Sequence, residues 1–147
     1  MKKLLSVILC LCVLGCAVTC AEEAGEDTFL LKIWDKSGLE ISYLRFDLYA
    51  GEEYRGLVCS CPDEGEDFYR APCSVGDADE LKDLRVVVSC GKSDLAPEDA
   101  ILEVMKGNPA EEQELLTLDF VPEYGKTYCL DLAADGDGGW KLVPAEA

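Results

Sequence analysis

Short runs of alternating apolar and polar residues begin at Phe29 and continue almost to the C-terminus, and they constrain the fold more than any other feature. Successive side chains of a strand point to opposite faces of a sheet, so a period of two indicates strands with one buried face. Turn-forming residues separate the runs, as in 35–38 and 135–139. The runs that we expect to be strands are 29–34, 39–50, 54–61, 84–90, 115–121, 127–133 and 140–143.

These strands predict a mainly β protein with one domain. A single sheet would leave its apolar face in water, whereas two packed sheets bury both apolar faces. We therefore expect a single antiparallel β-sandwich of about seven strands, of the immunoglobulin-like or prealbumin-like kind. The expected core consists of apolar residues from the alternating runs: Leu44, Phe46, Leu48, Val86, Val88, Leu116, Leu118, Phe120, Leu130 and Leu132.

The segment 94–107 carries signals for two kinds of structure. Pro97 at its front and Gly107 at its end are typical helix start and stop residues. Ile101 and Val104, in so short a run, also suit a strand. We favour one short helix near 95–106.

The first 21 residues have the layout of a bacterial export signal: a positive start, an apolar run and small residues before an acidic stretch. Cleavage after residue 21 would release a soluble protein. The sequence before Cys16 also resembles a lipoprotein signal, in which that cysteine is lipidated and becomes the mature N-terminus. The interpretation is therefore a signal at 1–21, an acidic tether at 22–27 and the sandwich domain at 28–147, secreted or anchored outside the cytoplasmic membrane.

The chain is strongly acidic, with 30 acidic and 13 basic residues and a net charge of −17. Binding to a nucleic acid backbone requires clustered Lys and Arg, so we exclude nucleic acid as a partner. An anionic membrane surface is disfavoured for the same reason, which leaves membrane contact only through the N-terminal lipid. Dispersed acids of this kind mainly serve solubility.

Several segments together resemble a known group of bacterial proteins. They are the export signal, the strands Phe29–Ile33 and Leu44–Tyr49, and the late Glu123–Tyr128 followed by a terminal hairpin. In this order they are similar to small secreted proteins or lipoproteins of gut clostridia. The resemblance implies an exported β-sandwich and carries no activity with it.

Cysteines outside the signal offer three kinds of chemistry. Cys59 and Cys61, on one face of the third strand, are candidates for disulfide bonds to Cys73 and Cys90 in an oxidising exterior. Buried free thiols are the alternative, because Cys also packs as a small apolar residue. A four-thiolate zinc site is the third, although the Cys-x-Cys spacing is tighter than usual for zinc.

One loop has a spacing of acids and glycines that is similar to a calcium loop. Asp135 and Asp137 are its candidate metal ligands, but Gly139 and Pro144 stand where an EF-hand needs ligands. We favour a hairpin turn for this loop, because Gly and Asp tolerate the backbone angles that a tight turn needs.

The chain contains no histidine, which removes the usual general base and the commonest metal ligand. No phosphate-binding or dinucleotide-binding motif is present, and no cofactor is expected. We therefore expect a non-enzymatic extracellular or surface-tethered domain that binds a protein or a glycan. The alternatives are a small hydrolase that uses acidic residues and a surface protein that holds calcium or a thiolate-bound metal. The expected contact residues are aromatic: Trp34, Tyr49, Tyr54, Phe68 and Tyr69.

Overall fold

The computed structural model of this chain describes residues 25–118 and 120–145. The expectations for the signal at 1–21, for Cys16 and for the first part of the tether at 22–27 lie outside the described residues. Within the described ranges, neither helix combines the length and the apolar character that crossing a membrane requires.

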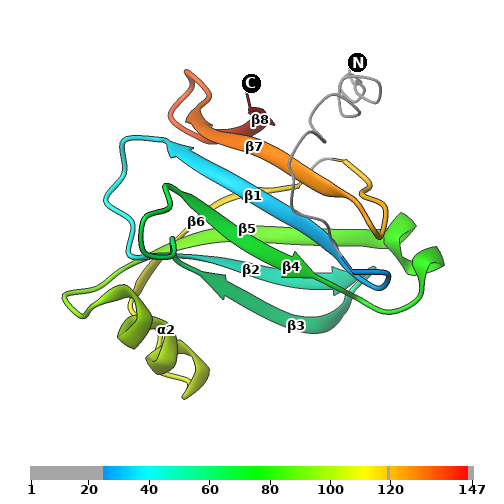
Figure 1. Cartoon of the computed structure of the whole chain (residues 1–147), viewed down its shortest axis with the longest axis horizontal. Helices are drawn as coiled ribbons and strands as arrows, with labels where there is room; N and C mark the ends of the chain where they lie inside the picture. The colour runs from blue at the N-terminus through cyan, green and yellow to red at the C-terminus, as the bar shows by residue number, and fades with distance from the viewer. Residues whose placement is uncertain (1–24, 119, 146–147) are drawn as a thin grey trace.

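Two four-stranded sheets pack face to face, which confirms the predicted β-sandwich (Figure 1). One sheet has the strand order β4-β1-β7-β8, and the other has the order β3-β2-β5-β6. The described strands are β1 (Phe29–Lys36), β2 (Tyr43–Ala50), β3 (Glu53–Ser60), β4 (Phe68–Cys73), β5 (Leu84–Lys92), β6 (Glu111–Thr117), β7 (Thr127–Ala134) and β8 (Trp140–Pro144).

Strand β4 was not expected from the sequence. It is short, it follows the acidic loop 62–67, and it contains Pro72, which weakens a strand assignment. Among the described strands β4 pairs with β1 alone and forms an edge of its sheet. An edge strand accepts proline because one side of its backbone has no strand to bond.

One pair of strands is parallel, so the expectation of a wholly antiparallel sandwich is wrong at this point. β1 pairs with β7 in parallel, with Leu30 opposite Thr127 and Lys36 opposite Ala133. The other strand pairs are antiparallel. The parallel pair places the first strand of the domain in the centre of a sheet, beside a strand from the last quarter of the chain.

The inner faces of the two sheets form the main core. Seven of the ten predicted core residues are at most 3% exposed, and they are Leu44, Phe46, Leu48, Val86, Val88, Leu130 and Leu132. Leu116, Leu118 and Phe120 are only partly buried against this core. The reason is that β6 spans 111–117 rather than the predicted 115–121, and that it is an edge strand with a register shift opposite Val88 and Ser89.

The segment near 95–106 is a helix, α2 (Pro97–Met105), as the capping residues predicted. Pro97 occupies its first turn, and Gly107 follows its end with a φ of 89°. Ala100 and Val104 pack with Tyr43 in a second, smaller core on the outer face of the β3-β2-β5-β6 sheet. This helix therefore covers part of a face that would otherwise be open to water (Figure 1).

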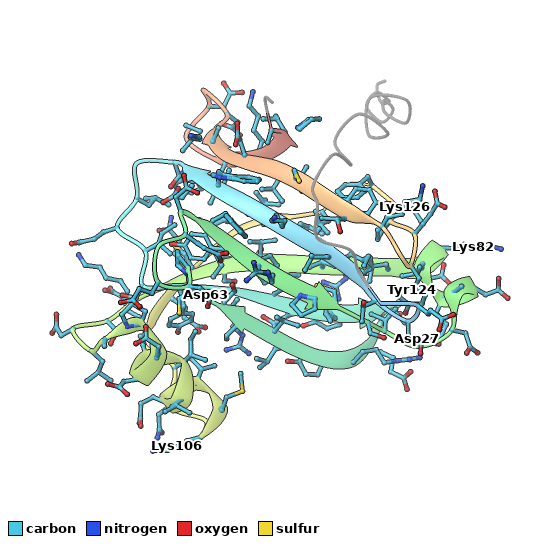
Figure 2. All side chains as sticks on the ribbon, in the orientation of Figure 1. Asp27, Asp63, Lys82, Lys106, Tyr124 and Lys126 are labelled. Atoms are coloured by element: carbon cyan, nitrogen blue, oxygen red, sulfur yellow. The ribbon has the colours of Figure 1, made fainter. Side chains whose placement is uncertain are left out.

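A 3-10 helix, η1 (Ala78–Asp83), precedes β5 at the opposite end of the sandwich from α2 (Figure 1). Tyr124 ties this end together, because its hydroxyl accepts the N–H groups of Val75 and Gly76 at 3.1 and 3.2 Å and donates to the Gly76 carbonyl at 2.7 Å. Figure 2 shows Tyr124 at this end and Asp63 at the other.

Candidate functional site

The structure divides the five aromatic residues expected at a binding surface into two surface pairs and one core residue. Trp34 and Phe68 lie opposite each other on β1 and β4, with ring centroids 5.2 Å apart. Tyr49 and Tyr54 form a second pair at 5.2 Å on the outer face of the other sheet. Tyr69 is 6% exposed in the core, because it alternates with Phe68 along β4, so its expected surface position is wrong.

Trp34 borders a surface hollow of about 340 Å³ on the outer face of the β4-β1-β7-β8 sheet. Lys36, Asp67, Asp131 and Ala145 complete its described lining. Strand register brings these residues together, because Asp131 lies opposite Trp34 in the parallel β1–β7 pair and Lys36 follows Trp34 on the same face of β1. The sequence separates the two strands by about ninety residues, so no local pattern pointed to this hollow.

A hydrogen bond fixes the Trp34 ring at the rim of this hollow. Its indole Nε1–H donates to Asp67 Oδ1 at 3.1 Å. Asp67 is the last residue of the acidic loop before β4. Arg70 holds that loop against the sheet, with one guanidinium nitrogen 2.8 Å from Asp63 Oδ2 and the other 3.3 Å from Glu66 Oε2. These contacts therefore hold the acidic loop in place, and its Asp67 forms one wall of the hollow.

Two cationic side chains lie against the Phe68 ring of the Trp34–Phe68 pair, although the protein as a whole is acidic. The Lys32 ammonium lies 4.3 Å from the centroid of the Phe68 ring, and the Arg70 guanidinium lies 5.1 Å from it. Both distances are within the range of a cation–π interaction. Together with Lys36 in the hollow, they give this face a mixture of positive and negative groups.

The Tyr49–Tyr54 pair lies beside a half-buried polar network on the outer face of the other sheet. Arg45 stands between two carboxylates, with its Nε 3.0 Å from Asp47 Oδ2 and its Nη1 3.3 Å from Glu112 Oε1. Each carboxylate also accepts a tyrosine hydroxyl: Glu112 that of Tyr43 at 2.6 Å and Asp47 that of Tyr54 at 2.9 Å. Burial and the hydrogen bond to Glu112 raise the pKa of Tyr43 well above its usual value.

Ion pairs and hydrogen bonds join the side chains of this network across the face of the sheet. A hydrolase that uses two carboxyl groups needs one that stays protonated near neutral pH, with a raised pKa. Both carboxylates of the network are ion-paired with Arg45. The carboxyl groups with a resolved shift elsewhere, Glu40, Glu80, Glu103 and Asp135, all have lowered pKa values because they accept hydrogen bonds. None of these observations favours the hydrolase alternative.

The four candidate disulfide cysteines are free thiols, so the expected bridges among Cys59, Cys61, Cys73 and Cys90 are absent from the structure. The faces of the strands explain this. Cys59 lies opposite Arg45 and packs under α2, whereas Cys90 lies opposite Leu44 and faces the main core.

Cys73 faces the core too, but it pairs with Phe29 at the first residue of β1, at the other end of the sandwich. Burial raises the pKa of the Cys59 thiol to about 11 and that of Cys73 to about 12, so both are neutral at pH 7. Cys129, on the outer face of β7, is not one of these four.

The loop with Asp135 and Asp137 forms the turn between β7 and β8. Asp135 Oδ1 accepts the backbone N–H groups of Asp137 at 2.7 Å and of Gly139 at 3.0 Å, and these hydrogen bonds lower the pKa of Asp135. The Asp135 carboxylate thus stabilises the turn in which it lies. Among the residues with described positions, no group of three or more His, Cys, Asp or Glu side chains is arranged to hold a metal ion. The calcium and zinc alternatives gain no support.

The architecture and this surface define a class: an acidic β-sandwich with an aromatic, polar hollow on one outer face. No family model, curated protein or solved structure matches the chain.

Proposed function

We propose that this protein is a non-enzymatic binding domain that works outside the cytoplasm, and that the hollow beside Trp34 is its ligand site. The observation that carries the proposal is the side-chain set of that hollow: one aromatic ring with carboxylates and an ammonium group around it. The volume of about 340 Å³ lies at the lower end of the range for ligand pockets, and a lining of one aromatic ring and three charged side chains suits a polar ligand. The resemblance to secreted clostridial proteins and the export signal support the location.

Rigid strands hold the site, which suits binding. Trp34, Lys36 and Asp131 stand on the central strands β1 and β7, and Asp67 is held through the hydrogen bond to Trp34. Side chains mounted on paired strands lose little conformational entropy when a ligand arrives.

Binding is tested on an array that carries bacterial wall fragments, mucins, purified glycans and extracellular proteins. The full chain, isolated from a bacterial host that exports it, is expected to bind at least one of these materials. Trp34→Ala is expected to lose that binding, because it removes the aromatic wall, whereas Tyr54→Ala, on the opposite outer face, is expected to keep it. Binding that survives in Trp34→Ala, or no binding to any class of material, would contradict the proposed site.

Anchoring is tested with Cys16→Ser. If Cys16 carries the lipid, this change is expected to move the protein from the membrane fraction to the medium and to remove the mass of the acyl chains. Intact mass spectrometry of both fractions reads the cleavage site at the same time. A soluble product that begins at residue 22 in both the original protein and the variant would exclude the lipoprotein form and leave secretion.

A further inference from the structure

The hollow beside Trp34 has a lining that distinguishes between classes of ligand. Asp67 and Asp131 present carboxylate oxygens, which only accept hydrogen bonds, and Lys36 presents an ammonium group, which only donates them. Lys36 stands in the lining and disfavours a cationic group at that point, whereas Arg70 nearby is already paired with Asp63 and Glu66. A strongly anionic ligand would be repelled by the two aspartates. A neutral ligand whose groups both donate and accept meets neither obstacle.

Hydroxyl groups have this double capacity, because each carries one donor hydrogen and two acceptor lone pairs. Trp34 adds an aromatic surface, on which a flat array of C–H groups packs well. A sugar ring presents both features at once: a face of C–H groups and an equator of hydroxyls.

We infer that the hollow beside Trp34 binds a neutral glycan, with one sugar ring packed on the indole and its hydroxyls bonded to Asp67, Asp131 and Lys36. This inference rests on the proposed function and names the ligand class of the same site. The two aspartates accept hydroxyl hydrogens, and Lys36 donates to a hydroxyl or ring oxygen. The hydrogen bond from the indole N–H to Asp67 leaves the carboxylate with further lone pairs for the sugar.

The position of the hollow also suits a chain-like ligand. It lies on an outer sheet face near the end of β1, and Asp63, in the loop that precedes β4, marks that end of the molecule in Figure 2. A chain-like ligand bound there lies on the surface and need not enter the core.

The test is a nuclear magnetic resonance titration of the full chain, labelled with nitrogen-15, with neutral tetrasaccharides of glucose, N-acetylglucosamine and mannose. The protein has two tryptophans, so it gives two indole N–H signals. The Trp34 signal is expected to shift with at least one tetrasaccharide, because its N–H lies beside the bound ring. The signal of Trp140, which borders a different hollow with Leu116 and Leu142, is expected to stay in place.

Matched variants and salt separate this ligand class from the others. Trp34→Ala and Asp131→Asn are each expected to weaken the affinity at least tenfold, and Trp140→Phe is expected to leave it unchanged. Because the sugar is neutral, raising the salt concentration to the molar range is expected to change the affinity less than twofold, whereas binding of a charged ligand would weaken strongly. Polylysine and heparin serve as cationic and anionic probes.

The inference is overturned if no neutral tetrasaccharide shifts the Trp34 signal in the millimolar range, or if only polylysine or heparin does so in a salt-sensitive way. If the array then shows binding to proteins alone, and Trp34→Ala abolishes it, the proposed binding function stands and the glycan class is wrong. If the sugars shift the Trp34 signal while the array shows no binding that depends on Trp34, the proposed function fails independently of the sugar contact.

Discussion

Replacing Phe46 by alanine is expected to lower the free energy of unfolding by about 3 to 5 kcal/mol, which is the usual cost of removing a buried aromatic ring. Phe46 is 0% exposed at the centre of β2, opposite Val58 on β3 and Val88 on β5. The surrounding residues come from two packed sheets with paired backbones, so they are unable to collapse fully into the space. Urea unfolding followed by circular dichroism measures the change.

A matched control uses the next outward position of the same strand. Asp47→Asn, on the opposite face of β2, keeps the side-chain volume and an oxygen for the Tyr54 hydroxyl but loses the charge paired with Arg45, and it is expected to cost clearly less than Phe46→Ala. If Phe46→Ala costs less than about 1 kcal/mol, the assignment of inner and outer faces along β2 is wrong, because a register slip of one residue exchanges the two faces.

Gly91→Ala is expected to destabilise the protein by about 3 kcal/mol, at the upper end of the range for overpacking a core. The Tyr43 ring crosses over Gly91 from the neighbouring strand to reach Glu112 on β6, and a Cβ atom at position 91 would overlap that ring. Tyr43 is 0% exposed, and its hydroxyl also accepts the N–H of Ala110 at 3.3 Å, so the ring has no free direction in which to move.

Two control variants separate the clash between position 91 and Tyr43 from a general sensitivity of β5 to substitution. Ser89→Ala, two residues earlier on the same outer face, adds no atom and is expected to cost less than about 1 kcal/mol. A double variant with Tyr43→Leu removes the part of the ring that lies over position 91, so its cost is expected to be less than the sum of the two single changes. Additive costs would contradict the steric explanation.

The sequence predicted well those elements whose signals are local. Alternation along Leu44–Leu48 identified both faces of β2, and Pro97 with Gly107 located α2. The errors arose where the decisive interaction is distant in sequence. Tyr69 was placed on the surface because β4 was not recognised as a strand, and the position of β6 was set by pairing with β5 rather than by its own apolar residues.

At the candidate site, too, residues with a local signal were predicted and residues placed by distant pairing were missed. Trp34 and Phe68 were expected at a binding surface from their residue type, and the structure places them together. Asp131 and Lys36 had no signal of their own, because only the parallel β1–β7 pairing brings Asp131 beside Trp34. The cysteines failed as disulfide candidates for a related reason: their spacing along the chain carries no information about which face of which sheet each would occupy.

The parallel pairing of β1 with β7 also determines when the domain can fold. During synthesis, β1 emerges almost a hundred residues before the strand β7 that pairs with it. Until residues 127–134 arrive, β1 has only the edge strand β4 beside it, and the apolar face of half the sandwich has no finished partner. Contacts of such long range slow folding, typically to milliseconds or seconds. The β3-β2-β5-β6 sheet is complete in sequence by residue 117, but its inner face obtains its full partner sheet only when the last quarter of the chain is available.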